Sequence, residues 1–396
     1  MNPKHIAAFT YMSAGHVYPY LDVCSELATR GHRVTFPAHE PFATRIREAG
    51  VEAIELKPFV FPAPKKLVPH DSVDDSTFWR HFGAVGCPWF MMNALFIVAE
   101  LEDFYAMNPP DVILYEWLNF AGRIFAKVLQ RPAIQMCTHF AHHEAMVRLD
   151  GAYTTPQPAR DVFPVIDNFM SMSGIEGRDH IWHTEPTNIF LLPREFQYDV
   201  ESFDNRFNFV GVTFNSRTNT STWKNGASHG RPILLISEGS LSNDDWFLRL
   251  CIKAFSESRY YVVFLRSMHK SDYSSLELPN NFEVNSSMAN REILPFADVA
   301  VCEAGIGTTL ECLYHGVPVV AVPSTPFNSE VAFRVSELGL GAHVPHRGIT
   351  PPALKTAVDT VSMDDALRRR MNCMREILKN NRGTELSADI IEGSLK

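Results

Sequence analysis

The sequence lacks the features that mark several common classes of protein. Its seven cysteines are odd in number and scattered, and no two form a Cys-x-x-Cys pair, so neither a disulfide framework nor a zinc knuckle is predicted. No apolar stretch approaches the length of about 18 residues that a membrane-spanning helix needs. The first apolar run is too short and its flank too weakly basic for a signal peptide. We therefore expect a soluble cytoplasmic protein with reduced thiols.

Basic residues are also in the minority. Lys and Arg number 36 against 45 Asp and Glu, which gives a net charge of −9, and no long basic run occurs. A protein that binds a phosphate backbone normally carries a basic patch or stripe. The charge balance therefore argues against nucleic acid as a partner.

The sequence does contain enough apolar residues to form the cores of two domains. The chain has 396 residues, of which 45% are hydrophobic and 20% are charged. At about 150 residues per domain, this length predicts two domains. Short buried strands alternate with helices in the first half, the strands at 6–10, 33–36 and 51–56, with a loop at 13–16 before a helix at 20–30. This alternation is typical of a parallel α/β layout.

The second half repeats the pattern of the first. A polar segment without periodicity occupies residues 213–222. Beyond it, strands are predicted at 233–236, 260–265, 299–301 and 317–322, with a helix at 244–256. A last helix is predicted at 364–379. Two similar α/β units therefore follow each other along the chain.

The most informative segment runs from Ala300 to Pro318. A buried strand ends in a Gly-x-Gly-Thr-Thr turn made by Gly305, Gly307, Thr308 and Thr309, and a helix follows at once. Glycines allow close backbone approach, and the free amides of a helix start attract anions, so the segment suits a diphosphate. The alternative is a tight turn with two hydroxyl caps. The third glycine of a dinucleotide fingerprint is absent, which disfavours a nicotinamide enzyme.

This segment resembles the donor-binding signature of glycosyltransferase family 1, the nucleotide-sugar enzymes that include the macrolide and plant natural-product glycosyltransferases. Four other stretches resemble that family in the expected order, so the resemblance covers essentially the whole chain. They are Gly15-His16-Val-Tyr-Pro19, Pro110-Asp-Val-Ile-Leu-Tyr-Glu116, Phe209-Val-Gly211 and Ser237-Glu-Gly-Ser240.

The resemblance implies the GT-B fold, an α/β architecture of two Rossmann-like domains that face each other across a cleft. We expect an acceptor-binding domain at residues 1–211, a linker at 212–230 and a nucleotide-sugar-binding domain at 231–375. Residues 376–396 are expected to form a C-terminal helix that packs back on the first domain.

The resemblance also implies the catalytic residues. His16 would be the general base on the acceptor hydroxyl, and Glu116, in place of a shorter aspartate, would orient it. The chemistry supports these roles, because an alcohol is a poor nucleophile at neutral pH and histidine titrates in the right range to remove its proton. A carboxylate can fix the tautomer of such a histidine and stabilise the imidazolium that forms.

The donor site departs from the family pattern. Glu303 replaces the usual histidine and would place a carboxylate beside two phosphates, where like charges repel. The acidic residue and glutamine that bind sugar hydroxyls fall at Phe327 and Asn328, and the base platform falls at residues 287–290. The donor contacts expected from the resemblance, at matching positions, are those of Ser240, Asn290, Glu303, Gly305, Gly307, Thr308, Thr309 and Asn328. Glu238 stands where a small or apolar residue is usual.

Two further groups of residues are candidates for the acceptor side. Aromatic side chains between residues 78 and 90, among them Phe78 and Trp89, either line a pocket for an apolar ligand or form the core of a helical cap. His139 and His142 follow a predicted strand, next to His143 and Glu144. These side chains have metal-ligating chemistry, but a polar pocket wall or a helix start is the preferred interpretation, and no metal site is predicted.

We therefore expect an enzyme that transfers a sugar or a deoxysugar, with inversion, from a nucleotide diphosphate to a hydroxyl of an apolar natural product. The co-substrate would be a UDP or dTDP sugar, and no other cofactor is expected. The alternative is a diverged relative that no longer transfers sugar and either binds a small molecule or performs other acid-base chemistry. Departures at Glu303, Phe327 and Ser287 favour that alternative.

Overall fold

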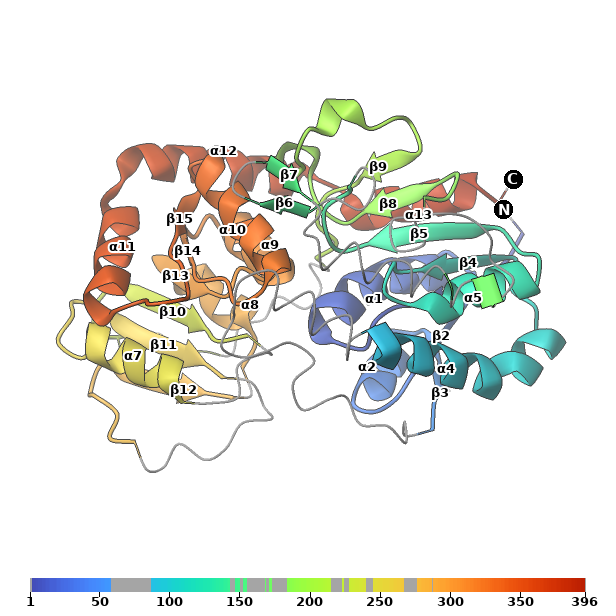
Figure 1. Ribbon diagram of the computed structural model, residues 1–396, viewed down its shortest axis with the longest axis horizontal. Coiled ribbons are helices and arrows are strands. Elements are labelled where there is room, and N and C mark those ends of the chain that lie inside the picture. The colour runs from blue at the N-terminus through green and yellow to red at the C-terminus, as the bar shows by residue number, and fades with distance from the viewer. Residues whose placement is uncertain are drawn as a thin grey trace.

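The computed structural model consists of two parallel α/β domains that lie side by side (Figure 1). It describes residues 2–57, 87–142, 147–149, 152–154, 168, 171–172, 184–214, 223, 228–239, 245–266, 276–286 and 288–395. Phe78, His143, Glu144, Ser240 and Ser287, on which sequence predictions were made, lie outside these residues.

The first domain contains a 7-stranded parallel sheet in the order β3-β2-β1-β4-β5-β8-β9. Its strands are β1 (His5–Phe9), β2 (Arg33–Ala38), β3 (Glu52–Glu55), β4 (Val112–Tyr115), β5 (Ala133–Cys137), β8 (Asn188–Phe190) and β9 (Phe207–Phe209). A separate antiparallel hairpin is formed by β6 (Val147–Leu149) and β7 (Ala152–Thr154).

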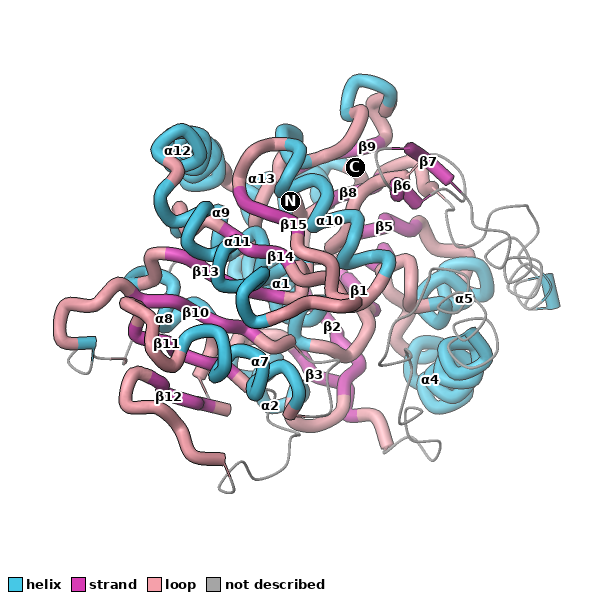
Figure 2. Tube along the Cα trace, turned by 60° about the vertical axis from the view of Figure 1, so that its left-hand side comes forward, coloured by secondary structure: helices cyan, strands magenta, loops and turns pink. Residues whose placement is uncertain are grey.

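Helices cover both faces of this sheet. On β1, Ala7 and Phe9 pack with α4 (Cys87–Met107) and α5 (Phe120–Val128), whereas Ile6 and Ala8 pack with α1 (Ala14–Thr29) and α2 (Phe42–Glu48). The alternation follows from the two-residue period of a strand, and burial on both faces explains why β1 is an unbroken apolar run. Figure 2 shows α4 and α5 together on one side of the first sheet.

The second domain contains a 6-stranded parallel sheet in the order β12-β11-β10-β13-β14-β15. Its strands are β10 (Ile233–Ser237), β11 (Tyr261–Leu265), β12 (Phe282–Asn285), β13 (Val299–Cys302), β14 (Val319–Ala321) and β15 (Gly341–His343). Its helices are α7 (Trp246–Phe255), α8 (Asn290–Ile293), α9 (Ile306–His315), α10 (Pro326–Glu337) and α11 (Pro351–Met363). The strand order therefore reverses beside β1 in the first sheet and beside β10 in the second.

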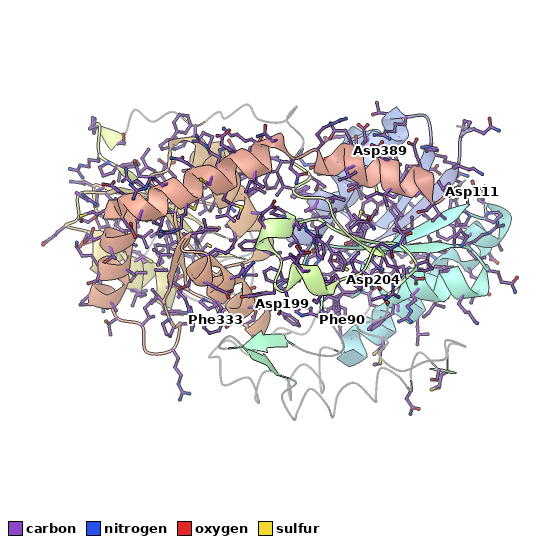
Figure 3. The ribbon with its side chains drawn as sticks, turned by 90° about the horizontal axis from the view of Figure 1, so that it is seen from above. Phe90, Asp111, Asp199, Asp204, Phe333 and Asp389 are labelled. Atoms are coloured by element: carbon purple, nitrogen blue, oxygen red, sulfur yellow. The ribbon has the colours of Figure 1, made fainter. Side chains whose placement is uncertain are left out.

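The last two helices connect the domains. Helix α12 (Asp365–Asn380) packs on α9, and α13 (Gly383–Gly393) packs on α1. Arg30 at the end of α1 donates hydrogen bonds to Asp389 (2.6 Å) and Glu392 (2.8 Å) of α13. Figure 3 shows the two helices laid across both domains, with Asp389 on the second. The boundary expected at residue 375 falls inside α12, and the chain crosses between domains at residues 381–382.

The sequence predictions misplaced the start of the first helix. Residues 13–16 were expected to form a loop, but α1 begins at Ala14 and contains Pro19. Ser13 is in an extended conformation, and its carbonyl accepts the amide hydrogens of His16 and Val17. His16 therefore lies in the first turn of a helix, where the backbone fixes its direction more firmly than a loop does.

None of the helices in the described part of the chain combines the length and apolarity that crossing a membrane requires.

Candidate active site

A histidine and a glutamate meet at the carboxyl ends of two neighbouring strands. His16 follows β1 and Glu116 follows β4, the two strands at which the sheet order reverses. Ligands of open α/β sheets bind at this position, because the loops after the two strands diverge to opposite faces. Nδ1 of His16 lies 2.5 Å from Oε1 of Glu116. The pairing expected from the sequence is therefore present in the geometry.

The Glu116 carboxylate is completely buried and held at both oxygens. Thr10 Oγ1 (2.7 Å) and the Tyr11 amide (3.2 Å) donate to Oε2, and Thr138 Oγ1 (2.8 Å) donates to Oε1. Burial by itself raises the pKa of this carboxyl, but attraction to His16 and the hydrogen bonds outweigh it and lower the pKa below the usual value. An ionised Glu116 accepts the Nδ1–H of His16, which leaves the Nε2 lone pair to take a proton.

Aromatic rings surround the exposed side of His16, whose side chain is 26% exposed. The Tyr11 ring meets His16 edge to face at 5.3 Å, and Trp89 of α4 meets Tyr11 at 6.2 Å. Phe90 packs on both of these rings. Trp89 is thus one ring away from the histidine, and it also packs against the core of the first domain.

The two domains touch at the glycines of their two motifs. Gly305 is the N-cap of α9, and Gly307 lies in its first turn. A Cβ added to Gly307 would lie 4.0 Å from the Cα of Gly15, the residue before His16. The N-terminus of α9, whose first amides have no acceptor within the helix, is therefore close to the His16–Glu116 pair.

The two threonines of the turn point in different directions. The Thr308 hydroxyl accepts a hydrogen bond from Asn290 Nδ2 (3.1 Å) and is partly exposed. Thr309 is completely buried beside Cys302, so its side chain does not reach the surface of the site. The prediction that Thr309 contacts the donor is wrong for its side chain, because one residue of helix turns it by 100° into the core.

Glu311 belongs to the same polar group, and the sequence analysis missed it. Asn290 Nδ2 also donates to Glu311 Oε2 (3.3 Å), one turn after Thr308. Burial raises the pKa of Glu311, more than the hydrogen bond from Asn290 and the nearby Arg291 lower it. A carboxyl group whose pKa is shifted by burial and by nearby polar groups is a frequent feature of functional sites. The sequence did offer one indication: Glu311 lies three residues after Thr308, so the two side chains share a face of the helix.

The two unusual glutamates of the donor side have different surroundings. Oε2 of Glu303 lies over Gly239, where an added Cβ would be only 2.4 Å away and where φ is +72°. The positive φ favours glycine at this position, whereas the flexible end of the Glu303 side chain could move aside for a Cβ. Glu238 is turned inward instead, and its carboxylate lies 3.5 Å from Nε of Arg266, which also donates to Asp245 (2.6 Å). Glu238 thus belongs to a buried ion-pair cluster.

Phe327 forms an apolar surface at the start of α10. Its ring packs with Trp117 and with His139, each at 5.9 Å. Asn328 is partly exposed in the same first turn, where its amide is capped by Thr325 Oγ1 (3.2 Å). Burial, and then repulsion from His16, lowers the pKa of His139 to about 4. Trp117, His139 and Phe327 therefore form an uncharged, mostly apolar wall at the start of α10.

A small cavity of about 30 Å³ lies behind this wall. His139 and His142 both line it, together with Trp117, Gln135, Cys137, Phe140, Thr184, Phe190 and Phe327. The structure thus places the two predicted acceptor-side histidines at one cavity, which they share with Phe327 from the second domain.

Comparison with known proteins gives consistent matches over the whole chain. The chain is 31% identical over 402 residues to the NDP-glycosyltransferase YjiC of Bacillus subtilis (strain 168), covering 100% of this chain and 98% of the relative. It is 29% identical over 409 residues to the demethyllactenocin mycarosyltransferase of Streptomyces fradiae, covering 99% and 86%. Residues 259–392 match the erythromycin biosynthesis protein CIII-like C-terminal domain. The crystal structure of the calicheamicin glycosyltransferase CalG4 superposes with a TM-score of 0.80 at 28% identity, covering 100% and 99%.

Two Rossmann-like domains that meet beside a histidine–glutamate pair define a glycosyltransferase of the GT-B type. The chain belongs to glycosyltransferase family 1, with the NDP-glycosyltransferases and the macrolide glycosyltransferases. It is an enzyme that transfers a sugar from a nucleotide donor. These matches favour sugar transfer over the alternative of a diverged relative that only binds a small molecule or performs other acid-base chemistry.

Proposed function

We propose that the enzyme transfers a deoxysugar, with inversion, from a UDP or dTDP donor to a hydroxyl of an apolar small molecule. The observation that supports this most strongly is the position of the His16–Glu116 pair beside the N-terminus of α9. A base for the acceptor and an anion-binding helix start then lie on either side of one reaction centre.

In the proposed reaction, Nε2 of His16 takes the proton of the acceptor hydroxyl while its oxygen attacks the anomeric carbon. The bond from that carbon to the diphosphate breaks in the same displacement, so the configuration at the carbon inverts. The nucleotide diphosphate leaves with the bonding electrons, and the proton remains on His16. Glu116, hydrogen-bonded to Nδ1, stabilises the imidazolium.

The start of α9 supports the departing diphosphate in this proposal. Its first amides point out of the helix and carry the positive end of the helix dipole. Thr308 adds a hydroxyl, and Glu311 accepts hydrogen bonds from donor hydroxyls beside it. In the proposed step, these amides stabilise the negative charge on the leaving diphosphate, and no metal ion takes part.

The apolar wall at Phe327 supports a deoxysugar. Each sugar hydroxyl that enters an apolar site loses hydrogen bonds to water and must find a partner there. The Phe327 ring, packed on Trp117, offers none, whereas an acidic residue at this position would. A sugar with a methyl or methylene group facing this ring loses fewer hydrogen bonds to water when it binds. The acceptor would lie against Tyr11 and Trp89, whose rings match an apolar scaffold.

The test is a transfer assay with a set of aromatic and macrolide alcohols and two matched donors, a dTDP-6-deoxyhexose and UDP-glucose. We expect a higher kcat/KM for the deoxysugar donor and a product of inverted anomeric configuration by NMR. The Phe327→Asp variant should shift the preference toward UDP-glucose. A retained configuration would overturn the displacement, and an unchanged donor preference in Phe327→Asp would overturn the role of the ring.

A further inference from the structure

Three side chains with metal-ligating chemistry converge between the two domains. His139 and His142 lie on the loop after β5, and Glu330 lies on α10, almost 190 residues away. Glu330 Oε2 is 3.4 Å from Nε2 of His142 and 3.9 Å from Nδ1 of His139. All three ligand atoms lie within 4.8 Å of one another. The glutamate is completely buried, and His142 nearly so.

These separations match the edges of a metal coordination polyhedron. In a tetrahedral site with bonds of about 2.0–2.1 Å, neighbouring ligand atoms are about 3.3 Å apart. The His142–Glu330 distance is near this value, the His139–Glu330 distance exceeds it by about 0.6 Å, and all three atoms lie within 4.8 Å, so His139 has to move closer when an ion binds. Two imidazoles and one carboxylate are a typical ligand set for zinc, whereas calcium and magnesium prefer oxygen ligands.

The backbone on both sides of the cluster is held by one short segment. Gln197 accepts the Ala141 amide (3.0 Å) and donates to the Ala141 carbonyl (2.9 Å), which fixes the loop between the two histidines. The next residue, Tyr198, donates its hydroxyl to the Glu330 carbonyl (2.9 Å). Sites that bind a metal tightly have their ligands positioned in this way before the ion arrives.

Helix α10 is also locked to this segment. Arg334, one turn after Glu330, donates to the carbonyls of Phe196 (2.9 Å) and Gln197 (2.8 Å), and its guanidinium lies 4.8 Å from the Tyr198 ring. Figure 3 shows Phe333 of α10 next to the segment labelled at Asp199. The cluster therefore sits in a rigid part of the boundary between the domains.

The cavity described above is lined by two of the three side chains, His139 and His142. Its volume of about 30 Å³ is enough for a water molecule. Three protein ligands and an open position next to a cavity are the arrangement in which zinc keeps a bound water.

We propose that His139, His142 and Glu330 bind one divalent first-row transition-metal ion, with zinc the best match, and that this ion joins the loop after β5 to α10. The site is separate from the start of α9, and the proposal does not depend on which sugar or acceptor the enzyme uses. Its function is to bridge the two domains.

The experiment uses the full-length chain after removal of metals by a chelator. Zinc chloride is titrated by calorimetry, and cobalt chloride is titrated by visible absorption, which reports tetrahedral coordination directly. We expect one ion per chain, an intense tetrahedral cobalt spectrum and a melting temperature that rises with zinc concentration. Magnesium chloride should change none of these readouts.

Two variants locate the site. His142→Ala and Glu330→Gln should each weaken zinc binding by about 100-fold or more and abolish the tetrahedral spectrum. Glu337→Gln, on the exposed side of the same helix, and His39→Ala, in the first domain, are the matched controls and should bind as the wild type does.

Several results would overturn the proposal. They are absence of zinc binding by the wild type, an octahedral cobalt spectrum, and binding that persists in both site variants, which would indicate surface histidines. The wild-type cobalt spectrum decides the matter even if a variant fails to fold. A hydrogen-bonded pair of protonated His142 and Glu330 would explain a wild type that binds no metal. Transfer activity is measured separately, so a failure of the metal site and a failure of the proposed reaction are distinguishable.

Discussion

Glu116 and Glu303 occupy corresponding positions in the two domains. Each directly follows the strand next to the first strand of its sheet, β4 in one case and β13 in the other. Each approaches the segment that follows that first strand: Glu116 contacts His16 in the first turn of α1, and Glu303 lies over Gly239 after β10. The same topological position thus carries a carboxylate in each of the two domains.

His16→Ala should lower kcat by about 10² or more, because a general base contributes on that scale. The side chain is partly exposed at a helix start, so the melting temperature should change little. Steady-state kinetics and circular dichroism measure both effects. Turnover within threefold of the wild type would remove His16 from the mechanism.

Glu116→Gln should lower kcat less than His16→Ala does, because Glu116 acts only through the imidazole. Glutamine keeps the shape of the side chain but removes the charge that stabilises the imidazolium, and its amide nitrogen cannot accept the hydrogen bonds that one of the carboxylate oxygens accepts. The comparison is made with the same donor and acceptor at saturating concentrations. A larger loss in Glu116→Gln than in His16→Ala would show that the roles are assigned wrongly.

The lowered pKa of Glu116 also predicts how stability depends on pH. A carboxyl whose pKa is lower in the folded state stabilises the fold above its unfolded pKa, about 4.3, and this stabilisation is lost as the pH falls through the folded pKa. The wild type should exceed Glu116→Gln in free energy of unfolding most clearly near neutral pH, and the gap should narrow below about pH 4. Urea unfolding at several pH values measures it, with the exposed Glu48→Gln as control. A gap that widens in acid would contradict the assigned direction.

Glu303→Gln should tighten nucleotide diphosphate binding by about tenfold. A carboxylate about 4 Å from phosphate oxygens costs on the order of one to a few kcal/mol, and 1.4 kcal/mol is a factor of ten in affinity. Glutamine has nearly the same shape, so packing over Gly239 is kept. Calorimetry with UDP and dTDP measures the change, with Glu337→Gln as control. Weaker binding in Glu303→Gln would show that the carboxylate assists the donor instead.

Local patterns in the sequence were sufficient for the alternating strands, and the resemblance of its motifs to a known family was sufficient for the His16–Glu116 pair. The sequence was not sufficient for side-chain direction within a helix, which decided against Thr309, or for contacts between distant segments. No sequence motif marks Glu330. It reaches His142 only because α10 packs against the segment near Gln197. Glu238 stood out in the sequence as a departure from the family pattern because its partner, Arg266, lies at the end of another strand.

In the proposed function, a nucleotide sugar binds at the start of α9, next to His16. The most direct test of this binding is calorimetric titration of the wild type with a panel of UDP and dTDP sugars, in the presence and absence of an apolar acceptor. We predict saturable one-to-one binding of at least one donor, with the deoxysugar donors ahead of UDP-glucose. A total absence of binding across the panel would contradict the account.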